Sequence, residues 1–187
     1  FVAQELAVRH PSRVRRLALL ASTPGGPRAV PMTPAALAVL LDRRDQDAEG
    51  LDGLFRRGLA VATAPGFCSR QSALCEALLA YRRGQPVAQT TYQWQVMAGA
   101  AYGGQPEEVI NARLAAIGAT TLVLAGAHDQ VTPPGNAALL QSALRDASAQ
   151  VLPDVGHLFP LEAPEVTAAA LRGFLRAETT KPRRAPN

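Results

Sequence analysis

Short apolar runs alternate with amphipathic stretches in the last third of the chain. Residues 122–125 are a continuous apolar run that closes at Gly126, which is typical of a parallel strand buried on both faces. Pro133 and Pro134 can open a helix, which the pattern continues over residues 137–144. The order of strand, helix and second apolar run predicts an α/β unit with parallel strands.

Polar residues follow both of these strands. Asp129 lies just past the first strand, and a second short strand at residues 151–153 precedes Gly156 and His157. A right-handed crossover puts the carboxyl ends of parallel strands at one edge of the sheet. We therefore expect Asp129 and His157 to come within hydrogen-bond reach there. An acid that orients an imidazole makes up two of the three parts of a catalytic triad.

The spacing of these residues resembles the α/β-hydrolase fold family. The residues that match its acid loop, G-x-x-D-x-x-x-P, and its histidine loop, G-H-x-x-x-x-E-x-P, are Gly126, Asp129, Pro133, Gly156, His157, Glu162 and Pro164. The first 26 residues are similar to the segment after the family's nucleophile elbow. The resemblance covers residues 1–26 and roughly 110–176. It implies a partial α/β-hydrolase fold, with three parallel strands, flanking helices and a helical cap.

The resemblance also implies roles for the two polar residues. In such a hydrolase His157 takes the proton of a serine hydroxyl, and Asp129 fixes the imidazole tautomer. The alternatives are a turn or helix-capping role for Asp129 and a turn role for His157. Asp154 and Glu162 are rival acids, although the first is only three residues from His157 and the second is placed to cap the last helix. His128 occupies a position that the family leaves variable, and we expect it to be exposed.

No G-x-S-x-G occurs in residues 1–187. By the register of Phe1, the resemblance places the nucleophilic Ser roughly four residues before the chain begins. We expect a carboxyl-terminal part of a hydrolase, inactive alone, whose complete form acts on an ester, lactone or similar carbonyl substrate. The alternatives are a non-catalytic fragment or scaffold, and a cofactor-free haloperoxidase or dehalogenase-like member of the same fold.

The first residues predict a helix at 1–9, ended by His10 and Pro11, and a strand at 14–21. In the family's strand order this strand pairs on one side with the strand that leads to the elbow, which residues 1–187 lack. An unpaired apolar edge favours association with other chains. We therefore expect poor solubility or self-association through this edge.

Residues 27–112 have a different character and resemble the family's helical cap. The helices predicted there and just beyond are 34–41, 50–62, 71–82, 87–101 and 107–117. Candidate substrate-binding residues are Tyr92, Trp94 and Met97 in the cap, and Ser22 in the turn after the strand at 14–21. The alternative is that the aromatic side chains only pack the cap onto the core.

These patterns divide the chain into a core, at residues 1–26 and 113–177, a cap at 27–112 and a disordered tail at 178–187. In the last helix, which Pro164 begins, we expect four residues to face inward: Val166, Leu171, Phe174 and Leu175.

Composition narrows the functions further. A hydrophobic content of 48% in 187 residues is enough for a packed core. The 19 basic residues exceed the 15 acidic ones, but the arginines are scattered in pairs rather than gathered on one face, which argues against nucleic-acid binding. No apolar run approaches the roughly 20 residues of a membrane span. We expect a small-molecule substrate and no metal or other cofactor.

Cys68 and Cys75 are the only cysteines. In one continuous helix, residues seven apart lie about two turns apart, which exceeds the roughly 7 Å Cα separation that a disulfide allows. We therefore expect two buried free thiols and a cytoplasmic protein.

Overall fold

Three parallel strands form the centre of the structure, a computed structural model that describes residues 1–42, 48–85 and 87–177. The strands β1 (Arg16–Leu20), β2 (Thr120–Gly126) and β3 (Ala147–Leu152) lie in the order β1-β2-β3. Leu19 pairs with Val123, and Val123 pairs with Ala149. The predicted partial α/β-hydrolase fold is confirmed, although β3 begins earlier than expected.

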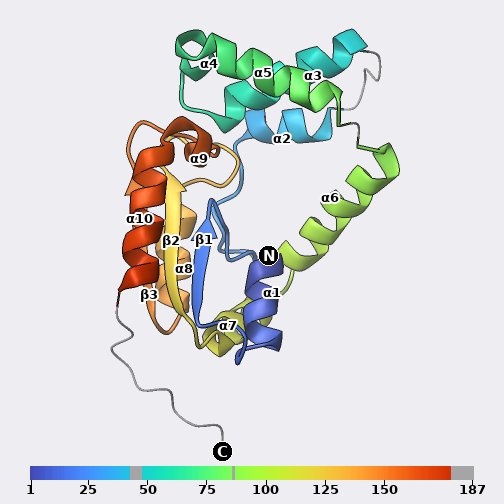
Figure 1. Cartoon of the computed structure of the whole chain (residues 1–187). Coiled ribbons are helices and arrows are strands. Elements are labelled where there is room, and N and C mark those ends of the chain that lie inside the picture. The colour runs from blue at the N-terminus through green and yellow to red at the C-terminus, as the bar shows by residue number, and fades with distance from the viewer. Residues whose placement is uncertain (43–47, 86, 178–187) are drawn as a thin grey trace, which may run out of the picture.

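Helices cover both faces of this sheet (Figure 1). On one face α1 (Val2–Arg9), α7 (Glu107–Ala116) and α8 (Gly135–Ala143) pack against alternate strand residues, which include Leu19 and Val123. The other face is covered by α9 (Phe159–Glu162) and α10 (Pro164–Arg176). Successive side chains of a strand point to opposite faces, so the continuous apolar run in β2 supplies both packing layers.

The last helix covers its sheet face only in part. Leu171 and Phe174 pack against the cluster around Leu124, as expected, but Val166 is 50% exposed and Leu175 is 60% exposed. The prediction that these two residues face inward is wrong. Thr167 is the residue of α10 that is buried, and its hydroxyl donates to the carbonyl of Phe159. The expected tail at 178–187 lies outside the described residues.

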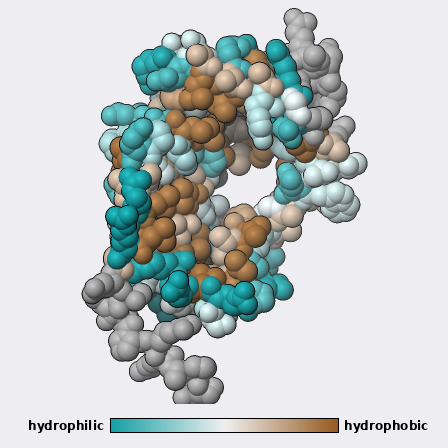
Figure 2. All heavy atoms as spheres, in the orientation of Figure 1, coloured by the Kyte–Doolittle hydropathy of each residue, from teal (hydrophilic) through white to brown (hydrophobic). Residues whose placement is uncertain are grey.

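The remaining helices lie beyond the carboxyl ends of the strands, and we call α2 to α6 the helical layer (Figure 1). They are α2 (Pro34–Leu41), α3 (Ala48–Ala62), α4 (Phe67–Arg70), α5 (Ser72–Arg83) and α6 (Gln89–Gly103). The helix predicted at 34–41 is confirmed to the residue, whereas α4 was not predicted. Figure 2 shows an opening through the molecule between the helical layer and the core. The proposed boundaries between core and cap stay a prediction.

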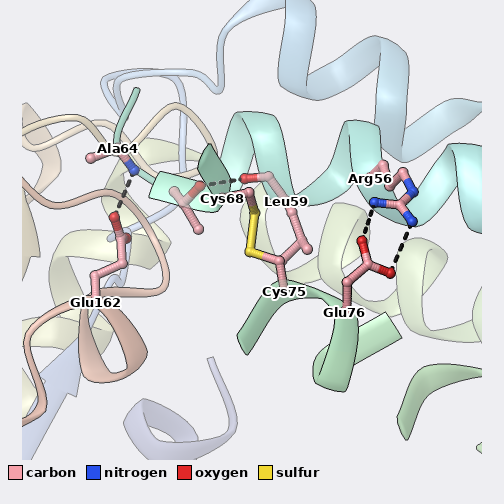
Figure 3. Close-up of a disulfide and its surroundings, with 8 residues drawn as sticks. Arg56, Leu59, Ala64, Cys68, Cys75, Glu76 and Glu162 are labelled. Atoms are coloured by element: carbon pink, nitrogen blue, oxygen red, sulfur yellow. Dashed lines mark hydrogen bonds and ion pairs between the residues drawn. A yellow bond between two sulfur atoms is a disulfide. The ribbon is translucent and has the colours of Figure 1, made fainter. Parts of the chain in front are cut away.

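The two cysteines form a disulfide, so the expectation of free thiols is wrong (Figure 3). Cys68 lies in α4 and Cys75 in α5, and the chain breaks its helical path at Gln71, which has φ −122° and ψ 46°. The break brings the two Cα atoms to 5.7 Å. A continuous helix could not do this, and the sequence pattern concealed the interruption. The expectation of a reducing cytoplasm rested on free thiols and loses that basis.

None of the described helices is both long and apolar enough to span a membrane.

Candidate active site

His157 and Asp129 are in contact at the carboxyl edge of the sheet, as predicted. Nδ1 of His157 donates a hydrogen bond to Oδ2 of Asp129 across 2.9 Å. The Asp129 side chain is fully buried, whereas the His157 side chain is 28% exposed. The acid is thus shielded from water, and the imidazole is open on one side.

The loop after β2 holds the Asp129 carboxylate in place. Its second oxygen, Oδ1, accepts hydrogen bonds from the backbone N–H groups of Val131 at 2.8 Å and Thr132 at 2.7 Å. These bonds offset the cost of burying the charge. Asp129 is therefore a turn residue as well as the partner of His157. Oδ1 binds the N–H groups of the turn, and Oδ2 binds the imidazole.

Gly126 lets the acid loop and the histidine loop touch. A Cβ built on Gly126 would lie 2.6 Å from the carbonyl oxygen of Val155 and would overlap that of Gly156. Next to this contact, the N–H of His128 donates to the carbonyl of Val155 at 2.8 Å. Only a residue without a side chain fits at position 126, because the backbones approach so closely.

The second ring nitrogen of His157 has no hydrogen-bond partner among the described residues. Because Asp129 accepts from Nδ1, the neutral ring carries its proton there and Nε2 is an acceptor. An imidazole oriented in this way can take a proton from a hydroxyl group that approaches Nε2.

The rival acids do not compete for His157 in the part of the chain that the structure describes. Asp154 is exposed and has a positive φ of 56°. Both carboxylate oxygens of Glu162 accept backbone N–H groups, from Gly156 and from Ala64. His128 is exposed, as expected.

Ser22 follows β1 at the same edge of the sheet, where its hydroxyl accepts a hydrogen bond from Nε2 of Gln4 at 3.2 Å. The same nitrogen donates to the carbonyl of Thr23 at 2.9 Å, and Gln4 is fully buried. Sequence reasoning missed Gln4. A single glutamine among the alanines of an amphipathic helix carries no sign that its amide is buried.

The candidate substrate-binding residues of the helical layer lie on α6. The hydroxyl of Tyr92 donates to the carbonyl of Leu40 at 2.7 Å and so ties α6 to α2. Trp94 is 68% exposed and Met97 is 60% exposed. The role of Tyr92, Trp94, Met97 and Ser22 in substrate binding stays a prediction.

No cluster of three or more His, Cys, Asp or Glu side chains that could hold a metal ion occurs in residues 1–42, 48–85 and 87–177.

A comparison with protein families matches residues 1–164 to the alpha/beta hydrolase fold. No curated protein matches the sequence.

Solved structures of hydrolases are similar to this chain. The 2-hydroxy-6-oxo-6-phenylhexa-2,4-dienoate hydrolase of Rhodococcus sp. strain RHA1 has a TM-score of 0.71 and 21% identity, over 94% of this chain and 60% of that one. Est816, described as an N-acyl homoserine lactone degrading enzyme, has a TM-score of 0.66 and 26% identity, over 92% of this chain and 62% of that one. A thermophilic esterase from Thermogutta terrifontis has a TM-score of 0.62 and 23% identity, over 94% of this chain and 60% of that one. The chain thus spans less than two thirds of the length of these relatives.

Proposed function

Because the chain belongs to the alpha/beta hydrolase fold family, we propose that Asp129 and His157 are the acid and the base of a Ser-His-Asp triad. The complete protein would hydrolyse an ester, a lactone or a similar carbonyl substrate. The observation that carries this proposal is the contact of 2.9 Å between the two side chains at the carboxyl edge of the sheet.

The proposed reaction follows from the orientation of the ring. Nε2 of His157 takes the proton of the serine hydroxyl while the serine oxygen attacks the carbonyl carbon. His157 then gives that proton to the leaving alkoxide, which departs as an alcohol from an ester and stays attached to the acyl group as a hydroxyl in a lactone. A water molecule repeats the sequence on the acyl-enzyme and releases the carboxylic acid. Asp129 keeps the proton of the neutral ring on Nδ1 and stabilises the imidazolium that forms in each half.

The serine is the part of the triad that residues 1–187 do not supply by motif. We propose that it belongs to a G-x-S-x-G turn whose Ser precedes Phe1 by about four residues. The helix that follows such a turn packs on the sheet, and α1 packs there. The packing of α1 supports this position for the serine.

The choice of an ester or lactone rests on two of the similar structures. One is described as a lactone-degrading enzyme and another as an esterase. Both reactions release an alkoxide leaving group that needs the proton held by His157. A non-catalytic scaffold would retain the same contact without turnover, so activity is the deciding property.

The test is hydrolysis of an activated aryl ester and of an acyl lactone. A protein that joins an upstream G-x-S-x-G segment to residues 1–187 should be active, and Asp129→Asn should lower kcat about 10⁴-fold. Residues 1–187 alone should show no turnover that depends on His157. Full activity of His157→Ala in the joined protein would overturn the proposal.

A further inference from the structure

Glu162 joins the histidine loop to the helical layer. Its Oε1 accepts the backbone N–H of Gly156 at 2.8 Å, and its Oε2 accepts the backbone N–H of Ala64 at 2.7 Å. Gly156 immediately precedes His157, and Ala64 lies in the turn between α3 and α4. Figure 3 shows the carboxylate of Glu162 reaching Ala64.

Residues 62–64 make further contacts with the histidine loop. The N–H of Leu158 donates to the carbonyl of Ala62 at 2.9 Å. A Cβ built on Gly156 would lie 2.7 Å from the carbonyl carbon of Thr63 and 2.8 Å from its Cα atom. Leu158 is therefore hydrogen-bonded to Ala62, and the backbone of Gly156 lies in close contact with that of Thr63. Both neighbours of His157 thus contact residues 62–64.

The helical layer fixes this turn from the other side. Thr63 and Ala64 are buried, and the N–H of Thr63 donates to the carbonyl of Leu59 at 2.9 Å. Leu59 packs with Phe67 and Cys75, and Leu158 of the histidine loop packs against the same cluster. The disulfide between Cys68 and Cys75 is part of this cluster and joins α4 to α5. A shift of α3 and α4 would thus be transmitted to the residues beside His157.

A carboxylate is the side-chain group best suited to bind the two backbone N–H groups of Gly156 and Ala64. Both groups that Glu162 binds are N–H donors, and each would lose its partner on removal of the carboxylate. A glutamine has one accepting oxygen, so its amide nitrogen would face an N–H donor on the other side. Glutamine therefore cannot make both bonds, although it has almost the same shape.

We propose that Glu162 is a positioning residue that sets the orientation of the His157 ring by tying its loop to the turn at residues 62–64. The proposal rests on the function proposed above, in which His157 is the base. The hydrogen bonds of Glu162 to Gly156 and Ala64 do not depend on that function. The position of the helical layer would then govern how well Nε2 of His157 meets the serine hydroxyl.

The experiment compares amide hydrogen exchange and the His157 Nδ1 proton resonance in the full chain and its variants. In Glu162→Gln we expect the amide of Gly156 or Ala64 to exchange at least about tenfold faster, because one hydrogen bond is lost. The Nδ1 proton resonance should also shift or broaden. The matched control is Glu76→Gln, which removes an exposed ion pair with Arg56 in the same layer and should change neither reading.

If Glu162→Gln does not fold, the same measurements are made on Glu162→Asp. Aspartate keeps the charge but is one methylene shorter, so it can hold only one of the two N–H groups. Unchanged exchange at both amides together with an unchanged ring resonance in a folded variant would overturn the inference. Rapid exchange of both amides in the unmodified chain would also overturn it.

The same spectra separate this inference from the proposed function. A ring resonance that responds to Asp129→Asn but not to Glu162→Gln contradicts only the role of Glu162. A ring resonance that ignores Asp129→Asn contradicts the contact on which the proposed function rests.

Discussion

The sheet core and the helical layer are held in place by different forces. In the core, Val123 and Leu124 are fully buried between covering helices. In the helical layer, Trp94 and Met97 of α6 are largely exposed. The layer meets the histidine loop through a small apolar cluster, in which Leu158 packs against Leu59, and through single polar contacts such as that of Glu162 with Ala64. Within the layer, Tyr92 joins α6 to α2.

This difference shows which kind of substitution each region tolerates. Burial of apolar surface is non-directional, so many side chains share the stabilisation of the core. A half-buried carboxylate that binds two N–H groups, such as that of Glu162, has no substitute of equal chemistry. The core should therefore respond to changes of volume, and the placement of the layer should respond to changes of single polar groups.

The largest expected effect is that of Gly126→Ala in the core. The added Cβ would overlap backbone atoms of the histidine loop, which cannot move without separating β2 from β3. We expect the free energy of unfolding to fall by about 3 kcal/mol or more in a chemical denaturation experiment.

The control lies in the helical layer. Gly58 is in α3, and a Cβ built there meets nothing within 4 Å. Gly58→Ala should raise the free energy of unfolding by roughly 0.5–1 kcal/mol through helix propensity. Equal effects of the two substitutions would mean that the close contact at Gly126 is absent.

Reduction of the disulfide should come next in size and should affect only the helical layer. Opening a loop of this length removes about 2 kcal/mol of stabilisation in the chain-entropy description. In hydrogen exchange, we expect the amides of α5 to lose protection while those of β2 keep it. A uniform loss over both regions would show that the layer and the core unfold as one unit.

The edge of the sheet at β1 offers a test of self-association. The N–H of Ala21 donates to the carbonyl of Leu124 at 2.8 Å. The backbone N–H and C=O groups of every second residue of β1 therefore point toward β2, and those of the other residues point away from it. Within the described residues, the sheet ends at β1. We propose that chains associate through this edge, and sedimentation should show oligomers that grow with concentration.

In a dilute monomer, the amide of Leu19 should exchange slowly and that of Leu20 quickly. Slow exchange of both amides would contradict an open edge.

The smallest effect concerns Tyr102, where α6 returns to the core. Burial raises the pKa of its phenol above the ordinary value, against the opposing influence of Arg113, whose guanidinium carbon lies 4.0 Å from the ring centre. The phenol is therefore protonated more readily in the folded chain than in the unfolded one. Its contribution to stability is present below pH 10 or so and is lost as pH rises through the raised pKa.

An absorbance titration of tyrosinate, with Tyr102→Phe as the reference, measures this shift. The difference between the two curves should show a transition above the ordinary tyrosine pKa. A transition at or below that value would mean that the phenol of Tyr102 is solvated.

The sequence predicted the core and the contact between Asp129 and His157 because both depend on local patterns. A continuous apolar run indicates a strand buried on both faces, and parallel connections bring the ends of such strands together. The helix of residues 34–41 was likewise predicted to the residue, and in the structure Thr33 caps it and Pro34 opens it.

Contacts that depend on tertiary detail could not be predicted. The break at Gln71 turned a separation of seven residues into a disulfide, and no glycine or proline marked it. The role of Glu162 depends on a turn almost a hundred positions away, at Ala64. Val166 and Leu175 fit a helical pattern, but the face that they present lies beyond the covered part of the sheet.

The protonation of the His157 ring tests the central claim most directly. The claim is that Asp129 keeps the proton on Nδ1 and leaves Nε2 free to accept one. Nitrogen-15 spectra of the labelled histidine, recorded where the ring is neutral, distinguish the two tautomers. We predict the Nδ1–H form in the unmodified chain and its loss in Asp129→Asn. A ring protonated on Nε2 in the unmodified chain would contradict the claim.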